Sequence, residues 1–176
     1  MITGQFGVYT LLSNLLTSIS SALGSTPGGT PGFVSIFPGE ISWDECCVGM
    51  LGITVSEHYI TSEFPHTSNI QNPVDLTTCR AAWYIVNVTI DLLRCAPQPQ
   101  GNNPEVTPQQ LALSAREVNA DAWVLIDTLS CYLQSQKDSY EIIDYSIERL
   151  SVAGPEGGCI GSEVLFAIAL YRGEDA

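Results

Sequence analysis

The N-terminal part of the chain carries apolar residues at helical spacing. Over residues 5–23 these residues form one stripe, and Ser, Thr and Asn fill the other faces, which predicts an amphipathic packing helix ending near Gly24. The stripe consists of Phe6, Tyr9, Leu12, Leu16, Ile19 and Leu23. Residues 24–32 are rich in Gly and Pro, and they predict a flexible loop or arm within one domain.

Alternation of apolar and polar residues then indicates strands. Apolar runs at 33–37 and 48–61 predict two of them, and residues 81–93 give the clearest signal. One face of 81–93 is apolar throughout, whereas the other turns polar toward Asn87, Thr89 and Asp91. The apolar face consists of Ala82, Tyr84, Val86, Val88, Ile90 and Leu92. Such a strand indicates a sheet that helices cover on one face only.

A second helix is predicted at about 108–134. Thr107 offers an N-cap, Pro108 stands at the first helical position, and Gln110 completes a capping box. An apolar stripe follows at three- and four-residue steps, and we expect it to pack on the apolar face of the 82–92 strand. The stripe consists of Leu111, Ala115, Val118, Ala122, Leu125, Leu129 and Leu133.

The last third of the chain predicts a β-hairpin. Residues 143–148 alternate, residues 154–158 form a turn rich in Gly and Pro, and residues 164–171 are apolar on both faces, as in a central strand. The predicted fold is therefore α+β. It has an N-terminal helix, a mainly antiparallel sheet with one long helix packed on it and a C-terminal hairpin, in a single domain over 1–176.

Composition adds an expectation about assembly. The chain is 45% hydrophobic but only 14% charged, whereas globular domains carry roughly a quarter charged residues. This shortfall favours an oligomer that covers part of its surface. A net charge of −13 repels phosphates and anionic membranes, so we expect no membrane binding and no grip on nucleic acid, although DNA could pass an acidic wall.

The residue types and their spacing give little indication of a catalytic or metal site. His58 and His66 are the two histidines, and no nucleophile motif accompanies either, so we expect neither catalysis nor a cofactor. A metal site would have to use Cys46, Cys47 and Cys79 with these histidines, and adjacent cysteines are poorly spaced for zinc. The six cysteines, at 46, 47, 79, 95, 131 and 159, are expected to be reduced and mostly buried.

The order of helix, loop, strands, capped helix and hairpin resembles the tail-terminator proteins of long-tailed bacteriophages (siphoviruses). Segments 43–44, 92–97, 107–108 and 154–162 are similar to actinobacterial phage neck proteins. The resemblance implies a structural virion protein in the neck: a hexameric ring, assembled in the host cytoplasm, that caps the tail tube and joins the tail to the head connector.

Other assignments remain open beside this one. Head-to-tail adaptors are largely helical and stoppers mostly β, so both fit the predicted mixture less well. A small cytosolic enzyme or ligand-binding domain that uses His58 or a cysteine is a further alternative.

A ring would give three acidic positions a role. Asp91, Asp144 and Glu148 are predicted on polar strand faces, and we expect them to share the face of the sheet that the long helix leaves uncovered. There they would either line a channel and repel passing DNA or form an ordinary solvated surface.

Overall fold

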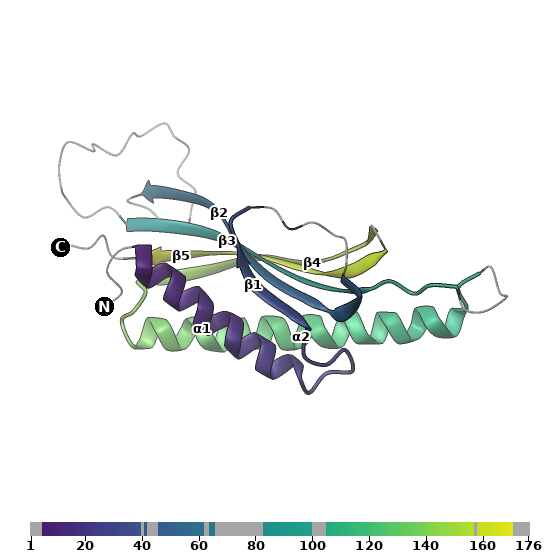
Figure 1. Ribbon diagram of the computed structural model, residues 1–176. Helices are drawn as coiled ribbons and strands as arrows, with labels where there is room; N and C mark the ends of the chain where they lie inside the picture. Colours follow the sequence, from purple (N-terminus) through teal and green to yellow (C-terminus); the bar gives the residue numbers. More distant parts are fainter. Residues whose placement is uncertain are drawn as a thin grey trace.

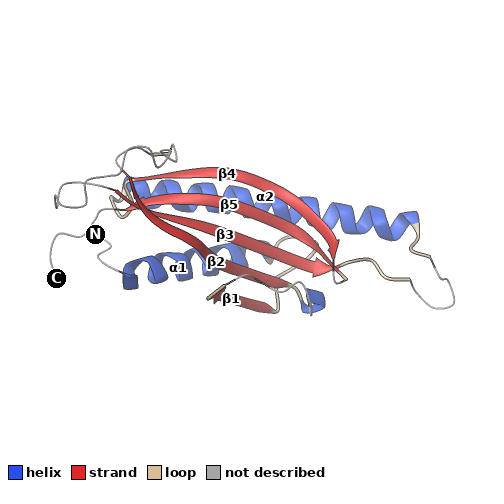
Figure 2. Ribbon diagram, turned by 90° about the horizontal axis from the view of Figure 1, so that it is seen from above, coloured by secondary structure: helices blue, strands red, loops and turns tan. Residues whose placement is uncertain are grey.

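Two helices pack on one face of a five-stranded sheet (Figures 1 and 2). The computed structural model describes residues 5–39, 41, 46–61, 64–65, 83–99, 105–156 and 158–170. In chain order the elements are α1 (Gln5–Leu23), β1 (Phe33–Phe37), the 3-10 helix η1 (Cys46–Val48), β2 (Met50–Thr61), β3 (Trp83–Cys95), α2 (Pro108–Asp138), β4 (Asp144–Glu156) and β5 (Cys159–Leu170).

The strands lie in the order β1-β2-β3-β5-β4. The β1–β2 pair is parallel and the other three pairs are antiparallel. Strand β5 lies between β3 and β4, as its two apolar faces predict. The α+β class, the mainly antiparallel sheet and the C-terminal hairpin are thereby confirmed.

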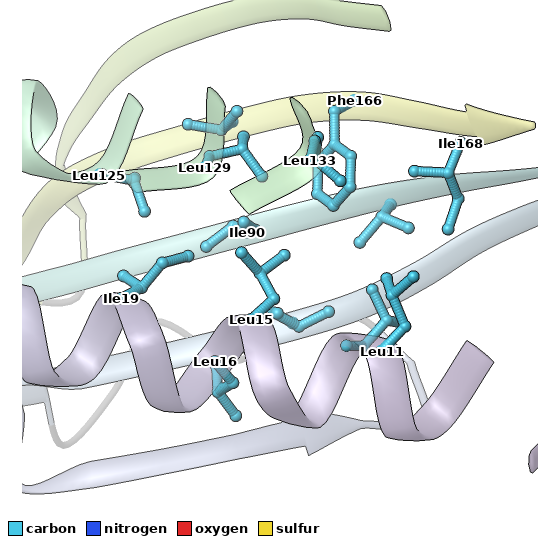
Figure 3. Close-up of a cluster of buried hydrophobic side chains, with 14 of the residues drawn as sticks. Leu11, Leu15, Leu16, Ile19, Ile90, Leu125, Leu129, Leu133, Phe166 and Ile168 are labelled. Atoms are coloured by element: carbon cyan, nitrogen blue, oxygen red, sulfur yellow. The ribbon is translucent and has the colours of Figure 1, made fainter. Parts of the chain in front are cut away.

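The main core lies between the helices and the sheet. Figure 3 shows Ile90 of β3 near side chains of both helices, among them Ile19 of α1 and Leu129 of α2. All three are fully buried. Helix α2 contacts β4 and β5, and α1 contacts β1 and β2. The apolar face of β3 therefore packs between the two helices, whereas the prediction named α2 alone.

The first turns of α2 extend past the end of the sheet in both views (Figures 1 and 2). The predicted capping box is present, with Thr107 accepting from the amide of Gln110. Leu111 and Ala115 are exposed, so the apolar stripe finds its cover only from Val118 onward. The prediction that the whole stripe packs on the sheet is therefore wrong for the first turns of α2. These turns lie beyond the ends of the strands, so no strand is there to cover them.

A buried ion pair holds the loop at 24–32. Arg94 of β3 donates to Asp121 of α2 at 2.8 Å and to the Gly29 carbonyl at 2.7 Å, and Thr26 donates to the same Asp121. A Cβ at Gly28 would lie 2.8 Å from the Arg94 guanidinium, so a side chain there would have to displace this guanidinium. The segment predicted as a flexible arm therefore follows a course fixed by its contacts.

Two disulfides join cysteines in the described part of the chain, and the prediction of reduced thiols is wrong for these four cysteines. Cys46 is bonded to Cys159, and Cys47 to Cys95. The register of β3 and β5 places Cys95 opposite Cys159, and η1 contacts β3 there. The spacing of the cysteines along the chain does not show that these four residues lie close together. Cys131 is free but exposed on α2, not buried.

Candidate functional site

The face of the sheet opposite the helices contains a cavity of about 540 Å³. Neither α1 nor α2 covers this face (Figure 2), although η1 packs Cys46 against Met50 and Leu93 at one end of it. The floor of the cavity comes from three neighbouring strands: Thr54 on β2, Thr89 and Asp91 on β3, and Glu163 on β5. Pro38, Gly39 and Ile41 form one wall. A cavity of this size is large enough for a small ligand or for a side chain of a partner.

Gly52 explains why this wall lies so close to the sheet. A Cβ at Gly52 would collide with the Ile41 side chain and lie 2.8 Å from the Phe37 ring. The Thr54 hydroxyl also donates to the Gly39 carbonyl at 3.1 Å. The absence of one side chain in β2 thus lets Phe37 and Ile41 pack beside the acidic floor.

Asp91 and Glu163 are direct cross-strand neighbours on β3 and β5. Asp91 is 6% exposed, and no described residue donates a hydrogen bond to its carboxylate. Burial and, secondarily, the negative charge of Glu163 raise the pKa of Asp91 from 3.8 to about 6. Glu163 is half-buried and accepts from Arg149 of β4 at 2.9 Å.

The floor therefore holds two unequal carboxylates. One is compensated by an ion pair within the chain, whereas the buried one has no donor. Like charges placed directly opposite each other destabilise a sheet, and a buried carboxylate without donors costs more still. Chemically, the pair can receive a cationic group or share a proton. Hydroxyls are the other reactive groups that line the cavity among the described residues.

The structure places the other two predicted acidic residues elsewhere. Asp144 lies at the start of edge strand β4 and pairs with Lys137 of α2 at 2.8 Å, which lowers the pKa of Asp144 despite the opposing effect of burial. Glu148 is exposed at an irregularity of β4. The row of Asp144 lies six residues from Glu163 along β5, about 20 Å. The three carboxylates therefore do not form one cluster.

His58 has no catalytic partner among the described residues. It is exposed on β2, with its Nδ1 2.7 Å from the Tyr84 hydroxyl and its ring stacked on that of Tyr84. It pairs with Val86, nine residues from Cys95 along β3, so the disulfides are roughly 30 Å away. His66 and Cys79 lie outside the described residues.

Within the described ranges, no group of three or more His, Cys, Asp or Glu side chains could hold a metal ion. No helix in the described part of the chain is long and apolar enough to cross a bilayer. A scan against protein-family models finds no match, and a search of curated proteins likewise finds none.

Glu163 and Arg149 are the site residues that sequence reasoning missed. A signal for Glu163 was present, since it is a lone charge in the apolar run of β5. A charged residue in a central strand is rarely buried without a partner, so Glu163 predicts a nearby ion-pair or hydrogen-bond partner. Arg149 carried no comparable signal because its partner is fixed only by the pairing of β4 with β5.

Proposed function

We propose that this protein is a ring-forming tail terminator, which caps the tail tube of a long-tailed phage and joins the tail to the head connector. The observation that carries the proposal is a set of large apolar side chains exposed on separate surfaces of one small subunit. Trp123 on α2 is 75% exposed, Phe33 on edge strand β1 is 49% exposed, and Val152 on edge strand β4 is 56% exposed. Such surfaces favour burial against partners.

The two faces of the subunit are unlike each other. Helix α2 lies on one side of the sheet (Figure 1) and presents the exposed Trp123 outward. The other side of the sheet carries the acidic cavity. Unlike surfaces on opposite sides suit head-to-tail contacts, which close into rings when the rotation permits. A mixed helix and sheet content also supports a terminator over the largely helical adaptors and the mostly β stoppers.

Charge supports the same role. A ring of subunits with a net charge of −13 each would repel DNA and let it pass. Of the three acidic residues considered for the channel wall, Glu148 alone combines exposure with no ion pair in the described structure. We therefore narrow the channel proposal to Glu148. The test is a Glu148→Lys phage: intact tails with slowed DNA entry support it, and unchanged infectivity contradicts it.

The disulfides bear on where the protein works. Disulfide bonds persist in oxidising surroundings, which include the surfaces of virions, and are rare in the cytosol. A virion protein that is assembled in the cytoplasm would acquire them on release. The neck of a virion, between capsid and tail, is the location that we propose.

The assembly itself is the test of this function. Native mass spectrometry and negative-stain electron microscopy of the purified chain, alone and with tail tubes of the same phage, should show a closed ring, which we expect to be a hexamer. A protein that forms no ring alone and binds no tail end would contradict the proposal.

The cavity supports one second candidate, a small ligand-binding domain. The buried Asp91, with its pKa raised to about 6, is the observation that favours it. This candidate predicts a compact monomer that binds a small cation. Calorimetry with alkylamines and guanidinium compounds distinguishes the two, since a terminator should assemble whether or not such compounds bind.

A further inference from the structure

The carboxylate of Asp91 lies against the cavity without a donor, although it is 6% exposed. Across the strands, Glu163 adds a second negative charge and is itself paired with Arg149. A buried carboxylate is costly until a cation or several donors reach it. A cationic group that enters the cavity would therefore be bound by both carboxylates.

The structure describes four basic side chains, and three of them are already paired. Arg94 binds Asp121, Lys137 binds Asp144, and Arg149 binds Glu163. The fourth, Arg116, is exposed on α2 and has no ion pair within the described part of the chain. A guanidinium suits a carboxylate pair because its donors form a planar fork.

Arg116 cannot reach the cavity of its own subunit. Helix α2 lies on one face of the sheet (Figure 1), and the β2, β3 and β5 residues that form the floor of the cavity lie on the other. We propose that Arg116 from a second copy of this chain enters the cavity and binds Asp91 and Glu163, so that α2 of each subunit docks over the cavity of the next. This inference rests on the proposed ring and names its contact.

Trp123 supports the choice of this helix surface. It follows Arg116 by seven residues, two helical turns or about 10 Å, and so lies on the same outward side of α2. Trp and Arg are the side chains most enriched among residues that dominate binding at interfaces. The two contact surfaces lie on opposite faces of the subunit, so this contact is head-to-tail and leaves each subunit free to bind the next.

A double-mutant cycle tests the pair. Arg116→Gln should weaken assembly at least tenfold, about the loss expected for one partner of a buried charged contact, measured by sedimentation across a concentration series. In the Asp91→Asn/Glu163→Gln background the same change should have little further effect, because its partners are gone. Lys137→Gln is the matched control: it removes an equal charge from α2, but one paired within its subunit, and assembly should be unchanged.

A positive readout complements the cycle. In an Arg116→Lys chain, carbodiimide coupling should join position 116 of one subunit to Asp91 or Glu163 of another, as found by peptide mass spectrometry. Rings that form equally well with Arg116→Gln, or coupling of position 116 only to other carboxylates or to tail proteins, would overturn this inference and leave the ring standing. A wild-type chain that never assembles would overturn both.

Discussion

Replacing Asp91 by Asn should stabilise the isolated subunit at neutral pH. The pKa of Asp91 rises from 3.8 to about 6 in the fold, so ionisation of this carboxylate opposes folding. Two pKa units correspond to about 3 kcal/mol, since one unit is about 1.4 kcal/mol. The buried Asn amide also needs partners, so we expect a gain of about 1–3 kcal/mol in the free energy of unfolding.

The sign of the pH dependence follows from the same shift. Between about pH 4 and pH 6 the folded state holds a proton on Asp91 that the unfolded chain has released. This group therefore lowers the stability of the wild type as pH rises through that window. Below about pH 4 both states are protonated, and the advantage of Asp91→Asn should disappear.

The assay is urea unfolding at pH 4 to 8, followed by tryptophan fluorescence at protein concentrations below those of assembly. Asp127→Asn removes an exposed carboxylate from α2 and serves as the control, for which we expect a change within about 0.5 kcal/mol. An Asp91→Asn chain that is less stable than the wild type at pH 8, or that has the same pH slope, would refute the reasoning.

The remaining predictions concern packing and assembly. Replacing Cys47 and Cys95 by Ser should lower the free energy of unfolding by about 2–5 kcal/mol, and added reductant should then affect the variant less than the wild type in thermal melts. Thr107→Ala should cost about 1 kcal/mol through loss of the helix cap, and Leu125→Ala roughly 2–5 kcal/mol through a core cavity. Urea titrations that rank these two in the reverse order would contradict the packing of α2. Trp123→Ala should weaken assembly in sedimentation experiments yet leave the melting temperature of the monomer nearly unchanged, because this side chain is 75% exposed.

Local patterns were enough to predict the elements of this fold. Three of the signals are properties of short segments: the capping box at Thr107, the alternation along β3 and the two apolar faces of β5. Such local patterns indicate whether a segment forms a helix or a strand. The one-sided pattern of β3 further indicated that helices cover one face, which the packing of Leu125 and Leu129 confirms.

Tertiary structure decided the pairings between distant residues. Asp121 looks like a surface residue of α2, yet it is buried because Arg94 reaches it from β3. The sequence predicted separate thiols. The register of β3 and β5 places Cys95 beside Cys159, where each is bonded to one of the adjacent cysteines 46 and 47.

Asp91 lies in a cavity because Pro38, Gly39 and Ile41 form a wall beside it, and it faces a second negative charge because β5 places Glu163 opposite it. The physical reason is the same in each case. Burial, and the partners it demands of a charge, depend on which strands become neighbours, and that is a property of the whole chain packed together, which the spacing of residues along it does not contain.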